Sequence, residues 1–187
     1  ITVTGNKQLV GTAWTAKYSF NFRLEKLLPD GSWEKLGEEA TAKEGSTSFD
    51  FNNAFVEERY TAQGVYYYRI IEIQPTTPLG GISYDKTVHS FAVHVGDKNM
   101  DGQLEITEVV SDRPNTTVVT QTNNGWNVNA NFTNTYSASG NATVTIDVNK
   151  FIDNIGGADK SLAGYKFGLF NAQGQQVSTL TTTDRKS

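Results

Sequence analysis

The sequence contains no cysteine, and this absence removes several kinds of chemistry at once. Without thiols the chain has no disulfide bond, no thiolate nucleophile and no cysteine-ligated zinc site. An extracellular protein with this composition would need another covalent crosslink if it had to resist force or proteases.

Long hydrophobic runs and clusters of positive charge are also lacking. No stretch approaches the roughly 20 apolar residues that a membrane-spanning helix requires. The net charge is −4, from 16 Lys and Arg against 20 Asp and Glu, so nothing favours nucleic-acid binding. The sequence shows no signal peptide, lipidation or anchoring motif, and we expect the chain to be an excised piece of a longer protein.

The usual catalytic arrangements are missing as well. No serine lies in a nucleophile-elbow context, and there is no glycine-rich phosphate loop. The two histidines, His89 and His94, are an odd number of residues apart, so in a strand they face opposite ways and do not bind one metal together. The sequence therefore supports no hydrolytic enzyme and, apart from the calcium loop described below, no cofactor.

What the sequence does contain is typical of an all-β protein. Thr, Val, Tyr, Phe and Asn are abundant, and long helical periodicity is missing. Short alternating segments are separated by turn signals about every 8–12 residues, which predicts a β-sandwich. Strands are predicted at residues 1–9, 17–28, 33–42, 46–51, 64–73, 82–95, 104–110, 116–121 and 126–136, with a short helical turn or loop within 52–62.

Three of the predicted strands carry one polar residue on an otherwise apolar face. Side chains of a strand alternate between its two faces, so this placement follows from residue number alone. Lys7 is the exception in the first strand, Glu72 in the tyrosine-rich strand and Asn134 in the last. We therefore expect a lysine, a carboxyl group and an amide to be buried together.

Five short motifs surround these three residues and follow one another in order. They are GNKQLVG at residues 5–11, YSFNF at 18–22, GVYYYRIIE at 64–72, ISYD at 82–85 and FTNTY at 132–136. With them the chain resembles the isopeptide-linkage domains of Gram-positive pilins and cell-wall adhesins, most closely the streptococcal pilin type related to collagen-adhesin B-type repeats. The resemblance implies an immunoglobulin-like β-sandwich over residues 1–137, crosslinked between Lys7 and Asn134 without an enzyme.

Elementary chemistry agrees with this implied reaction. Burial disfavours charge, so it lowers the pKa of Lys7, leaving a nucleophilic amine, and raises the pKa of Glu72, leaving a neutral acid. A protonated Glu72 is expected to donate a hydrogen bond to the carbonyl oxygen of Asn134 and to pass protons to the departing ammonia. A crosslink closing so long a loop contributes about 4–5 kcal/mol by the entropy model used for disulfides.

Each of the three residues also has an ordinary interpretation. A lysine near a strand end usually extends to solvent, a glutamate can be the exposed last residue of a strand, and a buried asparagine can simply be hydrogen-bonded. Two rivals are present, Lys17 as the amine and Asn131 as the amide. Both have the outward parity of their strands and are ranked lower.

A second unit is expected after a linker at residues 138–142. Residues 143–187 repeat the opening of the first unit: an alternating strand at 143–152 with an inward lysine, Lys150, then strands at 165–170 and 177–182. We interpret them as the incomplete start of a second, similar domain, in which Lys150 is a possible crosslinking lysine. A piece of about 45 residues seldom forms an independent core.

The segment DKNMDGQLEITE at residues 97–108 has the spacing of a calcium loop. Oxygen-bearing side chains fall at positions 1, 3, 5 and 12, and glycine at position 6. Asp97, Asn99 and Asp101 would be the ligands, whereas Glu108 would be carried away by an extended strand. The flanking residues alternate as strands do, so a plain β-hairpin turn is the competing interpretation.

We interpret the chain as a structural stalk or shaft module of a bacterial cell-surface adhesin or pilus, located outside the cell at the cell wall. Its expected partners are neighbouring repeats of the same protein and a host ligand that the sequence does not identify; it reacts once on itself and is otherwise no enzyme. The alternative is a calcium-stabilised ligand- or carbohydrate-binding module, for which Trp14 or Trp33 would supply an aromatic surface. A polymerising pilin backbone would need a sortase-targeted lysine and a sorting signal, and neither is identifiable.

Overall fold

In the computed structural model, residues 1–143, 145–148 and 162–183 are described. The chain divides into two units, Ile1–Ser139 and Gly140–Ser187. Within the described residues, no helix has both the length and the apolar character needed to cross a membrane.

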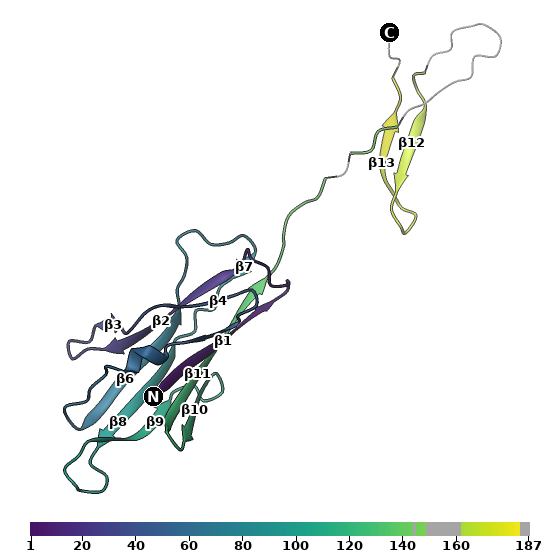
Figure 1. Cartoon of the computed structure of the whole chain (residues 1–187). Coiled ribbons are helices and arrows are strands. Elements are labelled where there is room, and N and C mark those ends of the chain that lie inside the picture. Colours follow the sequence, from purple (N-terminus) through teal and green to yellow (C-terminus); the bar gives the residue numbers. More distant parts are fainter. Residues whose placement is uncertain (144, 149–161, 184–187) are drawn as a thin grey trace, which may run out of the picture. The chain divides into compact units, whose positions relative to one another are not determined.

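The first unit is a β-sandwich of two sheets (Figure 1). The first sheet has the order β10-β11-β1-β5, with β7 beside β11, and its strands are β1 (Thr2–Val10), β5 (Ser48–Asp50), β7 (Ile82–Ser83), β10 (Thr117–Thr122) and β11 (Gly125–Tyr136). The second has the order β3-β2-β6-β8-β9, with β4 beside β2, and contains β2 (Ser19–Leu27), β3 (Trp33–Lys35), β4 (Ala40–Lys43), β6 (Gly64–Glu72), β8 (His89–Gly96) and β9 (Glu105–Ser111). A single 3₁₀ turn, η1 (Asn52–Phe55), follows β5 in the described part of the chain.

The core lies between the two sheets and follows the predicted alternation. In β2, β6 and β11 the buried inward residues include the rings of Phe20, Phe22, Tyr68 and Phe132. Phe22 stacks on Phe49 of β5, with ring centroids 3.9 Å apart. The ring of Phe49 would overlap any side chain at position 5, since a Cβ there would lie 2.1 Å from it. Gly5 therefore allows the aromatic core to reach the backbone of β1.

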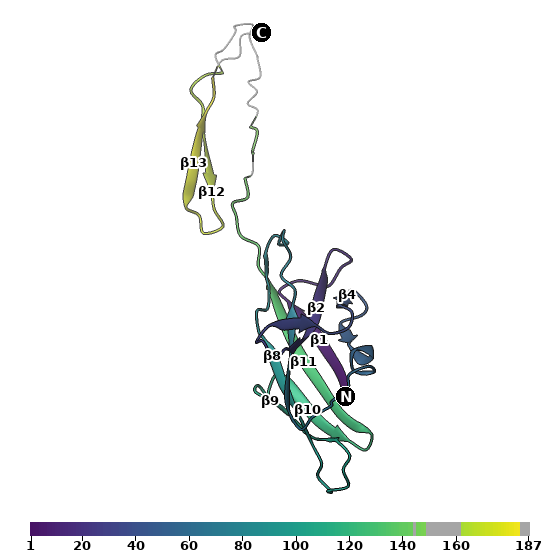
Figure 2. The ribbon, with the colours of Figure 1, turned by 90° about the vertical axis from the view of Figure 1, so that its left-hand side faces the viewer.

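The first and last strands of this unit, β1 and β11, lie side by side and run parallel (Figure 2). Their register pairs Thr2 with Asn127 and continues without interruption to Val10 and Thr135. Because Lys7 is opposite Phe132, Asn134 lies two residues further along on the same face of the sheet. This register brings the two ends of the sandwich sequence together at one place in the core.

Two predicted strands are each divided in the structure. Residues 33–42 form β3 and the start of β4, with a break at Gly37, whose φ of 71° suits glycine. Residues 82–95 form β7, which pairs with β11, and β8, which pairs with β6 and β9 in the other sheet. The carboxylate of Asp85 accepts a hydrogen bond from the main-chain N–H of Thr87, a local turn that interrupts the ladder where the chain changes sheets.

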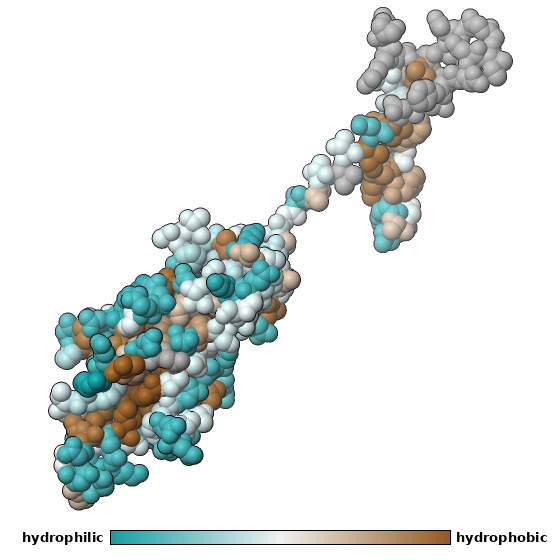
Figure 3. Space-filling view, viewed as in Figure 1, coloured by the Kyte–Doolittle hydropathy of each residue, from teal (hydrophilic) through white to brown (hydrophobic). Residues whose placement is uncertain are grey.

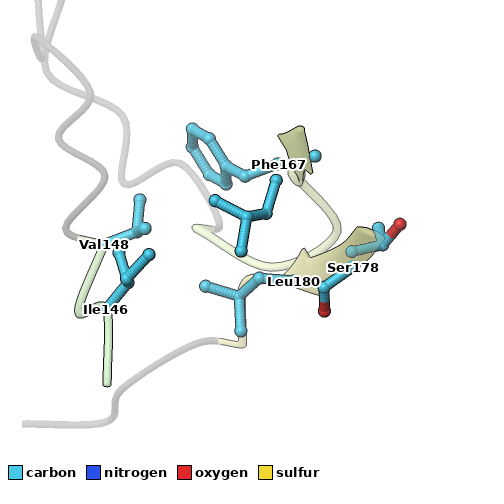
Figure 4. A pocket seen from close by; sticks show the side chains of 8 residues that line it. Ile146, Val148, Phe167, Ser178 and Leu180 are labelled. Atoms are coloured by element: carbon cyan, nitrogen blue, oxygen red, sulfur yellow. The ribbon is translucent and has the colours of Figure 1, made fainter. Parts of the chain in front are cut away.

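The second unit contains one antiparallel hairpin, β12 (Lys166–Phe170) and β13 (Gln176–Thr181), in its described residues. Ile146 and Val148 line a pocket of about 280 Å³ with Phe167 and Leu180 of the hairpin (Figure 4). Hydrophobic side chains remain exposed on the hairpin, whereas the visible face of the first unit carries hydrophilic residues together with hydrophobic patches (Figure 3).

The predicted strand at 143–152 is not confirmed. Its residues 143 and 145–148 are assigned to neither a strand nor a helix. Lys150 lies outside the described residues, so its predicted role is untested. The proposal that residues 143–187 begin a second, similar domain likewise stays a prediction.

Candidate functional site

Lys7, Glu72 and Asn134 meet in the interior of the first unit. Lys7 projects inward from β1, Asn134 from β11 beside it, and Glu72 from the end of β6 in the facing sheet. The Nζ of Lys7 lies 2.6 Å from Oε2 of Glu72, and Nδ2 of Asn134 donates to Oε1 of Glu72 at 2.6 Å. One carboxyl group therefore bridges the amine and the amide, and each of its oxygens serves one partner.

The site is closed to solvent. The side chains of Lys7 and Glu72 have no exposed surface, and Asn134 is also fully buried. Aromatic rings surround the amine: Lys7 Nζ lies 5.1 Å from the ring centroid of Phe20 and 5.9 Å from those of Phe22 and Phe132. These rings exclude water and supply no hydrogen-bonding group to compete with Glu72.

Burial changes the ionisation of both titratable groups. Desolvation lowers the pKa of Lys7, although the hydrogen bond to Glu72 and the charges of Glu72 and Asp85 act in the opposite direction. Desolvation likewise raises the pKa of Glu72, against the effects of Lys7 and Asn134. Because burial dominates in both, the pair is driven toward a neutral amine beside a neutral acid.

The amide of Asn134 has a defined orientation. Its Oδ1 accepts a hydrogen bond from the main-chain N–H of Asp85 at 2.6 Å. A main-chain N–H is only a donor, so the oxygen must face Asp85 and the NH₂ group must face Glu72. The expected hydrogen bond from Glu72 to the carbonyl oxygen of Asn134 is therefore wrong: Asp85 makes that contact, and Glu72 lies on the nitrogen.

Asp85 is the residue of the site that the sequence interpretation missed. It belongs to the ISYD motif, but no role was assigned to it. Both of its carboxylate oxygens accept main-chain hydrogen bonds, from Thr87 at 2.9 Å and from Thr133 at 2.8 Å. The only signal in the sequence was an acidic residue inside a predicted buried strand, where an unpaired charge would be unfavourable.

The two rival residues lie outside the site. Lys17 is exposed, and its Nζ lies 5.7 Å from the ring centroid of Tyr18. Asn131 is exposed on the outer face of β11, where its Oδ1 accepts from the amide of Asn6 at 3.2 Å. The strand parity that ranked them below Lys7 and Asn134 agrees with these positions.

The predicted calcium ligands hydrogen-bond within their own turn, and calcium binding by them stays a prediction. In the residues that the structure describes, no group of three or more His, Asp or Glu side chains is placed to hold a metal ion. Asp97 instead accepts the main-chain N–H groups of Asp101 and Gly102, and Asp101 accepts that of Gln103. Asn99 donates to Asp101, so the segment is hydrogen-bonded as a hairpin turn between β8 and β9.

The two tryptophans considered for carbohydrate binding are engaged elsewhere. Trp14 packs edge-on against Phe20, with ring centroids 5.4 Å apart. The ring of Trp33 is covered by the guanidinium group of Arg69, 4.2 Å from its centroid. Each ring thus has a partner within the first unit, and the carbohydrate-binding alternative gains no support from these contacts.

A comparison with protein families matches most of the first unit. A family model described as the Spy0128-like isopeptide containing domain, FctA, matches residues 3–137. The model therefore covers the first unit from β1 to the end of β11 and includes all three buried polar residues.

Solved structures of streptococcal pilins are similar to the chain. The major pilin protein T-13 from Streptococcus pyogenes serotype GAS131465 is 21% identical, with a TM-score of 0.46, over 72% of this chain and 52% of that chain. The major pilin from Streptococcus pyogenes is 25% identical, with a TM-score of 0.44, over 73% of this chain and 50% of that chain. The chain thus spans about half the length of these structures. Among curated proteins, none matches it.

Proposed function

Because the chain belongs, through residues 3–137, to the family of Spy0128-like isopeptide containing domains, we propose that its first unit forms an amide bond between Lys7 and Asn134. The observation that carries this proposal is the single buried carboxyl group of Glu72, which contacts the lysine amine with one oxygen and the asparagine NH₂ group with the other.

The reaction is a condensation that releases ammonia. The neutral amine of Lys7 attacks Cγ of Asn134, and the bond from Cγ to Nδ2 breaks. Oε2 of Glu72 accepts one proton from Nζ, and the proton on Oε1 passes to Nδ2, which departs as ammonia. Glu72 ends in the protonated state in which it began, so the step needs no cofactor and no external acid.

Fixed geometry replaces a collision between reactants. The fold holds the amine, the acid and the amide in contact, and well-oriented intramolecular reactions reach effective molarities of roughly 10⁵–10⁸ M. The burial of both side chains lowers the pKa of Lys7, which favours the unprotonated amine, and it excludes the water that would otherwise compete. Since the product is the protein itself, this is one self-modification and not turnover.

The bond would tie β1 to β11, the first and last strands of the unit. These strands are parallel, so a force applied at the two ends of the unit shears them along their length. A covalent link between them would carry that force in place of the main-chain hydrogen bonds. We therefore propose a structural role as a shaft module of a pilus or surface adhesin, located at the cell surface and joined to further pilus subunits or repeats.

Intact mass of the purified chain tests the crosslink. We expect the wild type to be lighter than its sequence by one ammonia, and peptide mapping to join Lys7 to Asn134. The Glu72→Ala chain and the isosteric Glu72→Gln chain should retain their full sequence mass. A wild-type chain with the full mass of its sequence would refute the proposal.

A further inference from the structure

Every polar main-chain and side-chain group of Asp85 has a partner. Its N–H donates to Oδ1 of Asn134 at 2.6 Å, and its carbonyl oxygen accepts from Nε2 of Gln74 at 3.1 Å. Its two carboxylate oxygens accept the main-chain N–H groups of Thr87 and Thr133. The residue whose N–H faces Asn134 is therefore held from several directions.

Two of these partners, Thr133 and Gln74, lie in or shortly after the strands that carry the reacting groups. Thr133 directly precedes Asn134 in β11, so the carboxylate of Asp85 is bound to the same strand as the amide. Gln74 follows β6 and also donates to the main-chain oxygen of Glu72 at 3.3 Å. Asp85 thus connects the strand of the acid to the strand of the amide, at the point where the chain changes sheets.

The position of its N–H matters for the proposed condensation. Attack of the lysine amine on Cγ moves negative charge onto Oδ1 of Asn134, the atom that this N–H already faces. A donor aimed at an oxygen that gains charge stabilises the transition state more than the ground state. Glu72, which lies on the nitrogen side, cannot serve this oxygen at the same time.

We propose that the main-chain N–H of Asp85 is the oxyanion donor of the Lys7–Asn134 condensation, and that the Asp85 carboxylate is the positioning group that holds this N–H on Oδ1. The inference rests on the proposed crosslink and adds a fourth residue to it. Asp85 neither gains nor loses a proton or a bond in the reaction.

The ionisation of Asp85 is consistent with a positioning role. Burial alone would raise the pKa of its carboxyl group, but hydrogen bonds from the Thr87 side chain and from the main-chain N–H groups of Thr133 and Thr87 outweigh it and lower the pKa. The group is therefore an acceptor and not a second acid. Its charge also helps to raise the pKa of Glu72, which favours the protonated form that the reaction uses.

The rate of ammonia loss tests this role. Chains would be made by cell-free translation, sampled over time, quenched in acid and weighed intact, while circular dichroism monitors folding. We expect Asp85→Ala to fold but to form the crosslink about ten-fold or more slowly than the wild type, because the N–H is no longer held in place. Asp85→Asn, which keeps one acceptor oxygen, should recover part of the rate.

Asp97→Ala is the matched control. Asp97 also accepts two main-chain N–H groups within a loop, but it follows the opposite end of β8. Its loss should leave the rate of crosslinking unchanged. An ester in place of the amide between Tyr84 and Asp85 removes the donor itself without altering any side chain, and should slow the reaction about 10²-fold.

The outcomes separate this inference from the crosslink itself. If the wild type and Asp85→Ala lose ammonia at the same rate while Glu72→Ala does not react, the Asp85 inference is overturned and the crosslink stands. If the wild type never loses ammonia, the proposed crosslink is refuted, and the Asp85 inference that rests on it is refuted as well. Should Asp85→Ala not fold, the ester chain decides, and an unchanged rate in that chain would refute the oxyanion role.

Discussion

The Nζ of Lys7 and the Oε2 of Glu72 lie 2.6 Å apart between two sheets, with no solvent-exposed surface on either side chain. A buried ion pair contributes little to the stability of a fold, because the free energy of removing two charges from water usually exceeds the free energy of their attraction. A pair that shares its proton internally avoids most of this cost and leaves a nucleophile beside an acid. The arrangement is thus better suited to chemistry than to holding the sheets together.

Loss of the crosslink should lower the stability of the first unit. Replacing Asn134 with Ala removes the electrophile, and the unfolded chain regains the freedom of a long loop, worth about 5 kcal/mol by the entropy model for disulfides. We expect the midpoint of urea unfolding to fall accordingly, measured by tyrosine and tryptophan fluorescence. Asn131→Ala, on the outer face of the same strand, is the control and should shift the midpoint little.

Pulling on single molecules should distinguish the two states of the first unit directly. With the crosslink present, force applied at the two ends bypasses all residues between Lys7 and Asn134, and no large extension should be released. In Asn134→Ala the same residues unravel and release about 45 nm, at roughly 3.6 Å per residue. A long unfolding step in a wild-type chain that has already lost ammonia would contradict the mechanical role.

Calcium should have no effect on stability. Asp97 and Asp101 already accept main-chain N–H groups within the hairpin turn, so these hydrogen bonds hold the turn without an ion. We expect the same thermal unfolding midpoint with millimolar calcium as with a chelator. A clear rise of the unfolding midpoint with calcium that is absent in Asp101→Asn would instead support the calcium prediction.

His89 should remain neutral in the folded protein below the pH at which an ordinary histidine gains a proton. It is fully buried, its Nδ1 shares a hydrogen bond with Thr117 Oγ1 at 2.8 Å, and its ring packs edge-on against Phe132, with ring centroids 4.3 Å apart. Desolvation lowers its pKa in the folded protein. Near pH 6.5 the histidine of the unfolded chain therefore becomes protonated, whereas that of the folded chain stays neutral.

The sign of the resulting pH dependence follows from this difference. The contribution of His89 to stability is complete above about pH 6.5 and declines as the pH falls toward the lower pKa of the folded state. Nuclear magnetic resonance titration of the imidazole Cε1 proton should give a midpoint below 6.5. A normal midpoint would show that the ring is accessible to protons in the native state.

The faces on which Lys7, Glu72 and Asn134 lie could be predicted from the sequence. Successive side chains of a strand point to opposite faces, and this alternation depends only on neighbouring residues. The same property ranked Lys17 and Asn131 below them, and both are exposed. The β-sandwich itself follows from similar reasoning, since short amphipathic strands can bury their apolar faces only by pairing sheets.

Only the tertiary structure decided which atoms meet. Residues 82–95 read as one alternating strand, but the chain changes sheets within them, because β7 finds its partner in β11 and β8 finds its partners in β6 and β9. This change of sheet brings the N–H of Asp85 to the side-chain oxygen of Asn134. The side-chain nitrogen of Asn134 then faces Glu72. Strand periodicity specifies a side of a sheet, whereas hydrogen-bond partners depend on distances between segments far apart in the chain, and these exist only after the sheets have packed.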